Sequence, residues 1–370
     1  MKSEKKINLL NLNRSELKKF FLSLDEKPYR VEQVMKWIYH RGVKDFALMT
    51  DLSRELRARL ESCACIQLPE VVSEHLSVDG TRKWIIRVAG DNCIETVLIP
   101  ERGRNTLCIS SQVGCILNCS FCATGKQGFD GNLDTAEIIG QVWLATERMR
   151  NLGLPKGVTN VVFMGMGEPL LNFDSVMCAT SLLMDDLGFG LSKRKVTVST
   201  AGVVPGILQM AGTTDCSLAI SLHAPTDDVR DKLVPLNKKY PISELLSACQ
   251  KYLSTLGERR HVTIEYTLIK GVNDHLDQAI ALAKLLREVS CKINLIPFNS
   301  FKASGYEAPD AETIDKFQSY LINAGYATML RTTRGDDIAA ACGQLAGQVK
   351  DRTRRQEKYL ARVRALEIAV

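Results

Sequence analysis

The sequence predicts an α/β protein whose core is a partial, TIM-like (β/α)6 barrel, preceded by a helical domain and a short β-rich connector. Two observations favour this fold class. After residue 104, six short apolar runs alternate with amphipathic stretches, and parallel neighbours in a sheet need such helical crossovers. The 370 residues are 45% hydrophobic and 24% charged, which is ordinary for a globular protein of about two domains. A doubly wound open sheet is the competing architecture.

We expect the helical domain over residues 1–68 and the β-rich connector over residues 69–100. In the helical part, the apolar residues Val31, Val34, Met35 and Ile38 repeat with the period of a helix. Gly42 follows them and predicts the end of that helix. The connector contains short β-rich runs, and Asp79-Gly80 between two of them predicts a hairpin turn. The N-terminal part of the chain therefore precedes the barrel as a separate element.

The core is expected over residues 101–337, and residues 338–370 form a C-terminal segment with a basic tail. Its strands are predicted at LCISSQ (107–112), NVVFMG (160–165), KVTVST (195–200), SLAISLH (217–223), VTIEYTLI (262–269) and KINLIPF (292–298). Amphipathic helices are predicted at residues 135–149, 173–186, 242–257 and 276–289. In such a fold the functional groups gather on the loops after the strands.

The composition limits the possible partners and compartments. No apolar run reaches the length of about eighteen residues of a membrane span, and the start of the chain does not resemble a secretory signal, so we expect a cytoplasmic protein. The net charge of +6 permits a nucleic-acid partner without demanding one. In the stretch KDRTRRQEKYLARVRAL, basic residues crowd together, which fits either a solvated helix face or phosphate contacts.

Three cysteines lie within eight positions after the first predicted strand: Cys115, Cys119 and Cys122. In a reducing compartment such clustering indicates a metal site or catalysis. A structural zinc site needs four ligands, and neither a second cysteine pair nor a histidine lies near this loop. An ordinary four-cysteine iron–sulfur site meets the same objection. A cubane held by three thiolates, with one iron open to a small ligand, fits the pattern best.

Further polar and glycine residues follow the other predicted strands. Gly167 and Glu168 come after the second strand, where glycine lets a ligand approach the backbone and a carboxylate can accept from an ammonium group. The third, fourth and sixth strands are followed by Ser199, by Ser221-Leu222-His223 and by Asn299. Each signal is weak alone, but all fall where a barrel assembles its site.

The spacing CxxxCxxC after the first strand resembles the signature of the radical S-adenosylmethionine (SAM) enzymes. Longer motifs make the resemblance more specific: CISSQVGCILNCSFCATGKQGF, GMGEPLLN, STAGVVPGI, AISLHAP, CKINLIPFN and TRGDDIAAACGQLAG. The chain is similar over nearly its whole length to the RlmN family of adenosine carbon-2 RNA methyltransferases, including the N-terminal PYRVEQVMKWIYHRG. The resemblance implies a radical SAM core, a 4Fe-4S cluster on Cys115, Cys119 and Cys122, and two SAM molecules per turnover.

The resemblance also implies how carbon 2 of adenine, an electrophilic position, receives a methyl group. One SAM methylates a cysteine that matches Cys342, and a second is cleaved to a 5′-deoxyadenosyl radical that removes hydrogen from the S-methyl group. The carbon radical then adds to the ring. Cys108 matches the partner that forms a transient disulfide with Cys342, and Glu95 matches the proton acceptor, with Cys108 as the competing candidate. Sequence pattern alone predicts a buried helical Cys342 and a solvent-facing Glu95.

By the same resemblance, the residues expected to contact SAM are Gly167, Glu168, Ser199, Ser221, Leu222, His223 and Asn299. The implied substrates are 23S rRNA in its peptidyl-transferase region and tRNA at the adenosine 3′ of the anticodon. We also expect an electron donor such as flavodoxin or ferredoxin, a monomeric protein and no membrane association. The basic tail, with Arg352, Arg354 and Arg355, and the helical domain are expected to dock RNA.

Two alternative functions are retained. The related enzyme that methylates carbon 8 of the same rRNA adenosine and gives antibiotic resistance shares the cluster, both cysteines and the chemistry. A non-catalytic RNA-binding protein with a structural metal is the alternative from another class, and it predicts zinc in place of iron.

Overall fold

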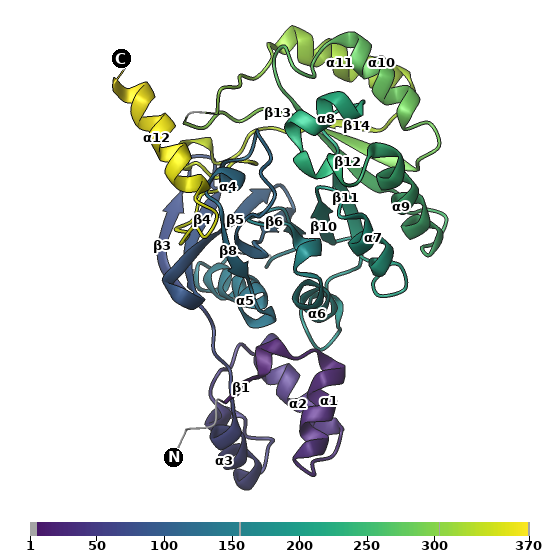
Figure 1. Ribbon diagram of the computed structural model, residues 1–370. Coiled ribbons are helices and arrows are strands. Elements are labelled where there is room, and N and C mark those ends of the chain that lie inside the picture. The colour runs from purple at the N-terminus through teal and green to yellow at the C-terminus, as the bar shows by residue number, and fades with distance from the viewer. Residues whose placement is uncertain (1–5, 155–156, 303, 369–370) are drawn as a thin grey trace.

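The computed structural model describes residues 6–154, 157–302 and 304–368. Figure 1 shows a small helical domain at the N-terminus, a large mixed sheet with helices beside it, and a C-terminal helix near the start of the core. The described residues contain one sheet of ten strands and two small two-stranded sheets. The predicted α/β class is therefore confirmed.

The N-terminal domain contains the helices α1 (Arg14–Ser23), α2 (Tyr29–Met35) and α3 (Arg54–Cys63). The predicted helical stripe is confirmed, because Val31, Val34, Met35 and Ile38 are fully buried. The helix continues as a wider turn over Lys36–His40 and ends before Gly42, whose φ of 69° suits glycine. Two short strands absent from the prediction, β1 (Ile7–Asn8) and β2 (Ala64–Cys65), pair in parallel and join the two ends of the domain.

This domain packs against the helices of the core. The indole Nε1 of Trp143 on α5 (Thr135–Asn151) donates to the carbonyl of Ile38 at 3.2 Å. Asn11 Oδ1 accepts from the backbone N–H of Ala136 at 2.7 Å, close to the start of α5. Figure 1 shows the domain below α5 and α6 (Phe173–Met184), away from the C-terminal helix.

The connector is an antiparallel part of the main sheet. Its strands are β3 (Glu70–Leu76), β4 (Arg82–Val88) and β5 (Asn92–Glu101), and the predicted hairpin at Asp79-Gly80 lies between β3 and β4. β5 pairs antiparallel with the first strand of the core, so no gap separates connector and core.

The core strands are parallel and follow one another in sequence order across the sheet: β6 (Arg104–Cys108), β9 (Asn160–Phe163), β10 (Val196–Thr200), β11 (Ser217–Ser221), β12 (Val262–Leu268), β13 (Cys291–Pro297) and β14 (Thr328–Leu330). A doubly wound sheet reverses this order at a switch point, and none occurs here. Because neither edge strand pairs with the other, the sheet remains an open, partial barrel.

The six predicted core strands are confirmed, with two differences. The first ends at Cys108, and residues Gln112–Gly114 form a separate strand, β7, which pairs with β8 (Phe129–Asn132) to bracket the three-cysteine loop. The seventh strand, β14, is not apparent in the sequence because it has three residues, none of them fully buried.

Helices connect the parallel strands. The four predicted helices correspond to α5, α6, α9 (Ile242–Ser254) and α10 (Leu276–Leu285). Others were not predicted: α4 (Ala123–Lys126), α7 (Val204–Met210), α8 (Asp227–Leu233), α11 (Ala311–Asn323) and α12 (Arg355–Ile368). Single turns of helix lie at Leu9–Asn11, Phe46–Leu48, Ala89–Asp91, Pro169–Leu171, Pro235–Lys238 and Asp336–Ile338. Among the described residues, no helix combines the length and the apolar character required to cross a membrane.

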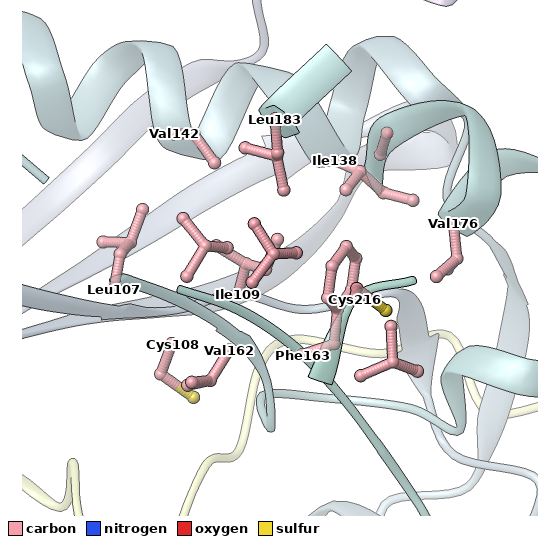
Figure 2. Packing of buried hydrophobic residues seen from close by; sticks show 14 of the residues in the cluster. Leu107, Cys108, Ile109, Ile138, Val142, Val162, Phe163, Val176, Leu183 and Cys216 are labelled. Atoms are coloured by element: carbon pink, nitrogen blue, oxygen red, sulfur yellow. The ribbon is translucent and has the colours of Figure 1, made fainter. Parts of the chain in front are cut away.

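The main core lies between the sheet and the helices. Figure 2 shows Leu107 and Ile109 pointing toward α5, where Ile138 and Val142 meet them, whereas Cys108 points to the other side of the sheet. This alternation follows from the two-residue period of a strand. It leaves the thiol of Cys108 on the face where the functional groups gather.

Replacing Ile138 by alanine is expected to lower the free energy of unfolding by about 2–5 kcal/mol, because the side chain is fully buried between α5 and the sheet. Ile280→Ala on α10 is the matched control, because that side chain is 45% exposed. Urea unfolding followed by circular dichroism measures both. Equal losses in the two variants would contradict this packing.

Candidate active site

A cavity lies at the carboxyl ends of the parallel strands β9 to β13. Predicted site residues from widely separated segments line it together: Cys115, Cys119, Cys122, Gly167, Glu168, Ser199, Ser221, His223, Asn299 and Cys342. Since the carboxyl ends of parallel strands meet at one edge of a sheet, residues far apart in sequence converge here. Leu222, Glu95 and Cys108 lie outside this lining.

The three-cysteine loop runs between β7 and β8. The backbone N–H of Cys115 donates to the carbonyl of Gly128 at 2.8 Å, which closes the base of the loop. A side chain at Gly125 would lie 3.2 Å from the carbonyl oxygen of Cys119, so glycine keeps the loop compact. All three thiols are free and face one cavity.

This donor set fits a cluster with three protein ligands. Among residues 6–154, 157–302 and 304–368, no three Cys, His, Asp or Glu side chains converge closely enough for a single metal ion. Thiolates are the ligands of iron–sulfur clusters, and a cluster is larger than one ion. The three cysteines therefore suit a cluster and leave room beside it in the same cavity.

Gly167 and Glu168 form the next part of the cavity wall. Gly167 has a φ of 100°, and a Cβ there would lie 2.4 Å from Cβ of Gln112. The side chain of Gln112 instead accepts from the N–H of Glu168 at 2.8 Å. The Glu168 carboxylate accepts backbone N–H groups of Ala201 and Leu170 at 2.7 and 3.1 Å. Burial raises the pKa of Glu168 to about 6, and the bonds from Ala201 and Leu170 oppose the rise because they stabilise the ionised carboxylate.

Glu265, which the sequence analysis missed, joins two of the predicted serines. It lies on β12 and lines the cavity, and its Oε2 accepts from the Ser199 hydroxyl at 2.9 Å. Burial raises its pKa, while hydrogen bonds from Ser199 and Ser221 oppose that rise. The only sequence signal is an acidic residue in an apolar strand, which we did not use. Its carboxylate fixes the orientation of both hydroxyls.

Arg230 on α8 is a second residue that the sequence analysis missed. It is fully buried, and its guanidinium donates to the carbonyls of Ala201, Ser221 and Leu222 at 2.6, 3.1 and 3.1 Å. These carbonyls follow β10 and β11, where the strands have ended and ladder partners are lost. The arginine therefore holds two of the cavity-forming loops in place.

His223 is buried at the cavity wall with a φ of 58°, and its ring contacts that of Phe121 edge-on at 4.5 Å. Burial, with a contribution from Arg230, lowers the pKa of His223 to about 3. Its Nδ1 accepts from the N–H of Thr267 at 3.0 Å, so the neutral ring carries its proton on Nε2. Leu222 is fully buried and contributes through its backbone.

A second cavity adjoins the first. It is lined by Cys108 and by arginines of several segments, among them Arg104, Arg331 and Arg334. Met164, Ile296, Asn299 and Cys342 line both cavities. The Cys342 thiol thus lies where a group bound beside the three cysteines and a group in the arginine-lined cavity can both reach it.

The loop that carries Cys342 is held by its neighbours on both sides. Asn299 donates to the carbonyl of Cys342 at 3.0 Å. The N–H of Ala123 on α4 donates to the carbonyl of Gly343 at 2.8 Å, and the Thr124 hydroxyl donates to that of Leu345 at 2.7 Å. The expectation of a buried helical Cys342 is wrong, because the residue lies in this loop and is exposed.

Glu95 is buried, so the expectation of a solvent-facing side chain is wrong. The strand β5 is covered on both faces from Asn92 to Leu98, and alternation in the sequence does not report exposure there. The Glu95 carboxylate lies 3.4 Å from Nζ of Lys83 and accepts the N–H of Ala346 at 3.0 Å. It therefore holds the far end of the Cys342 loop.

The basic tail is only partly available to an RNA. Arg352 pairs with Asp130, and Arg355 donates to backbone carbonyls of the three-cysteine loop. Arg354 is exposed. The side chains of Arg362 and Arg364 lie outside the described residues. Arg352 and Arg355 thus have protein partners, and the RNA-docking role expected for the basic tail stays a prediction.

Comparisons with known proteins identify two parts of the chain. Residues 7–66 match the model of the ribosomal RNA large subunit methyltransferase N-terminal domain. Residues 109–283 match the radical SAM superfamily, and this range contains the three-cysteine loop and the strands β9 to β12.

Whole-chain relatives agree with these matches. The dual-specificity RNA methyltransferase RlmN of Pseudomonas putida is 59% identical over 96% of this chain and 94% of its own length. RlmN of Pseudomonas fluorescens is 57% identical over 98% and 96%. A crystal structure of a radical SAM methyltransferase from Sphaerobacter thermophilus, 42% identical, superposes with a TM-score of 0.85 over 92% of this chain and 99% of that one.

Replacing Arg230 by methionine is expected to lower the free energy of unfolding by about 3 kcal/mol or more, because three buried carbonyls lose their donor. Arg287→Met, at an exposed position, is the control. Chemical denaturation of both variants makes the comparison. If both lose the same small amount, the guanidinium does not hold the loops.

Proposed function

Because this chain belongs to the RlmN family of radical SAM RNA methyltransferases, we propose that it methylates carbon 2 of adenosine in two kinds of RNA. The substrates are an adenosine of the peptidyl-transferase centre of 23S rRNA and the adenosine 3′ of certain tRNA anticodons. The observation that carries the proposal is the position of Cys342 between two adjoining cavities.

The first cavity suits the cofactors. Cys115, Cys119 and Cys122 would hold a 4Fe-4S cluster with one iron open to SAM, and two SAM molecules are used in each turnover. When bound, the cluster and SAM supply a 5′-deoxyadenosyl radical. The carboxylate of Glu168 would accept from the SAM ammonium group, since its backbone partners already orient it. Gly167 lets Gln112 pack against this backbone and hold the N–H of Glu168.

The remaining SAM contacts come from the other strand ends. Ser199 on β10 and Ser221 on β11 both hydrogen-bond Glu265 of β12 and line the cavity, and Asn299 lines it from the segment after β13. The Nε2–H of neutral His223 can donate without introducing a charge. Leu222 supports this wall through the carbonyl that Arg230 holds.

Cys342 Sγ would accept the methyl group as a thiolate. The walls of the two cavities desolvate this thiol and raise its pKa, although the residue as a whole is exposed, and Arg331 opposes the rise. A positive group beside the thiol therefore favours the nucleophilic form at the point where the methyl group must arrive. Once methylated, the side chain adjoins both cavities and presents the group to a base in the second one.

Cys108 would resolve the adduct by attacking Cys342 Sγ: the disulfide forms as the bond from that sulfur to the methylene carbon on the base breaks, and the carbon keeps the electron pair and takes up a proton to become the methyl group. Both thiols line the second cavity. Burial raises the pKa of Cys108, and the charge of a Cys342 thiolate raises it further. Glu95 is the proposed proton acceptor. Its carboxylate is held by Lys83 and by the N–H of Ala346, whereas Cys108 lines the second cavity.

RNA would reach the second cavity with its target adenosine turned out of the helix. Arg104, Arg331 and Arg334 line this cavity and suit the phosphates beside the flipped nucleotide. The N-terminal domain and the exposed Arg354 offer further contacts. We place the protein in the cytoplasm as a monomer that receives electrons from a flavodoxin or ferredoxin, without a membrane partner.

Reaction of reconstituted protein with RNA, followed by nuclease digestion and mass spectrometry, tests the proposed function. The expected product is 2-methyladenosine. Product with 8-methyladenosine would identify the carbon-8 enzyme instead. Purified protein that binds zinc and no iron would support a non-catalytic RNA-binding protein.

Replacing Cys342 by alanine is expected to abolish RNA methylation while iron content remains at the wild-type level, because this thiol carries the methyl group and is not a cluster ligand. Cys291→Ala is the control, since that cysteine lies at the start of β13. Isotope transfer from labelled SAM to RNA measures activity, and iron analysis measures the cluster. Methylation by the Cys342→Ala protein would contradict the assignment.

Replacing Arg331 by glutamine is expected to weaken RNA binding and to reduce the slope of log affinity against log salt by about 1, as for one lost phosphate contact. Lys316→Gln is the control, because Lys316 lies on the exposed part of α11 and pairs with Glu312. Fluorescence anisotropy with a labelled anticodon stem-loop measures both. A salt slope unchanged by Arg331→Gln would remove this arginine from the RNA contacts.

A further inference from the structure

The C-terminal segment returns to the three-cysteine loop after it has passed the Cys342 loop. Arg355, the first residue of α12, donates through Nη2 to the carbonyl of Cys115 at 2.7 Å and through Nη1 to that of Gly125 at 3.1 Å. Its Nε donates to the Thr353 hydroxyl at 2.9 Å. One guanidinium therefore joins two points of the loop that lie on either side of Cys119 and Cys122.

The turn before Arg355 is fixed by its own contacts. Asp351 accepts from the N–H of Gln356 and of Thr353, both at 2.7 Å, and so caps the start of α12. This carboxylate lies where a Cβ of Gly128 would be, at 1.8 Å from Asp351 Oδ1. Gly128, with a φ of 85°, thus provides the space in which the turn docks.

Neighbouring contacts hold the turn from outside. Arg352 pairs with Asp130 at the end of the same loop, and its N–H donates to the carbonyl of Phe129 at 3.3 Å. One turn into α12, the Tyr359 hydroxyl donates to the carbonyl of Lys302 at 2.5 Å. A segment whose only role is to bind RNA would leave these polar groups free to contact phosphates. Here they are directed at the protein's own loop.

We propose that Arg355 is a positioning residue for the iron–sulfur cluster: it clamps the loop that carries Cys115, Cys119 and Cys122 and sets a positive charge against it. The inference rests on the proposed function, which places the cluster on these cysteines. Charge-assisted hydrogen bonds to two carbonyls restrain the loop more strongly than neutral ones would. A nearby positive charge favours the reduced cluster, because reduction adds one negative charge.

Two substitutions separate the clamp from the charge. Arg355→Gln removes both, whereas Arg355→Lys keeps the charge but cannot donate to two carbonyls in the same forked geometry. Arg354→Gln is the matched control, because it removes the same charge from the adjacent, exposed residue. All variants are made in the full-length protein and reconstituted anaerobically.

Two measurements report on the cluster without requiring turnover. A redox titration followed by electron paramagnetic resonance gives the ratio of reduced to oxidised cluster at fixed potential. We expect this ratio to fall about fivefold in Arg355→Gln and to stay near the wild-type value in Arg355→Lys and Arg354→Gln. Extraction of iron by a chelator is expected to be about tenfold faster in both Arg355 variants than in Arg354→Gln.

Several outcomes would overturn the inference. Equal extraction rates in Arg355→Gln and Arg354→Gln would exclude the clamp. Equal potentials in Arg355→Gln and Arg355→Lys would exclude the electrostatic effect. A wild-type protein that takes up no iron would overturn the proposed function itself, whereas a normal wild-type cluster that Arg355→Gln leaves unchanged would overturn this inference alone.

Discussion

Both cavities depend on a strand order that never reverses. From β6 to β14 each parallel strand lies beside its predecessor in the sequence, so successive helical crossovers run in one direction. Right-handed crossovers in one direction place their helices on one side of the sheet. In the described part of the chain, no such layer of helices covers the other side, which the three-cysteine loop and the C-terminal segment occupy. For this reason Leu107 belongs to the core, whereas its neighbour Cys108 faces a cavity.

The cavity walls contain charged groups that would be costly to bury without partners. Arg230 meets three backbone carbonyls, and Glu168 accepts two backbone N–H groups. Glu265 is held by serine hydroxyls. Fixed protein dipoles therefore take the place of water around each of these charges before any cofactor binds. A wall with satisfied groups keeps its geometry, which is what a reactive site needs to exclude other reactions.

The sequence predicted those parts of the molecule in which a local residue pattern reflects a local requirement, such as burial or space beside the backbone. The parallel strands are apolar because they are buried. Gly167 was expected to allow a close approach to the backbone, and the group that approaches it in the structure is Gln112. Long-range partners were not predictable in this way. The burial of Glu95 depends on a C-terminal segment about 250 residues away, as shown by its bond to Ala346. Arg355 belongs to a basic run that suits solvent equally well, and only the fold supplies its carbonyl partners.

The short helix α4 links the two functional loops. Ala123 and Thr124 hold the carbonyls of Gly343 and Leu345, and the carbonyl of Gly125 receives Arg355. Three consecutive residues of the three-cysteine loop thus support the segment after Cys342 and the start of α12. These bonds fix the segment directly after Cys342, where Gly343 turns the chain with a φ of 84°. The loop proposed to hold the cluster therefore also fixes the position of Cys342, the proposed methyl carrier.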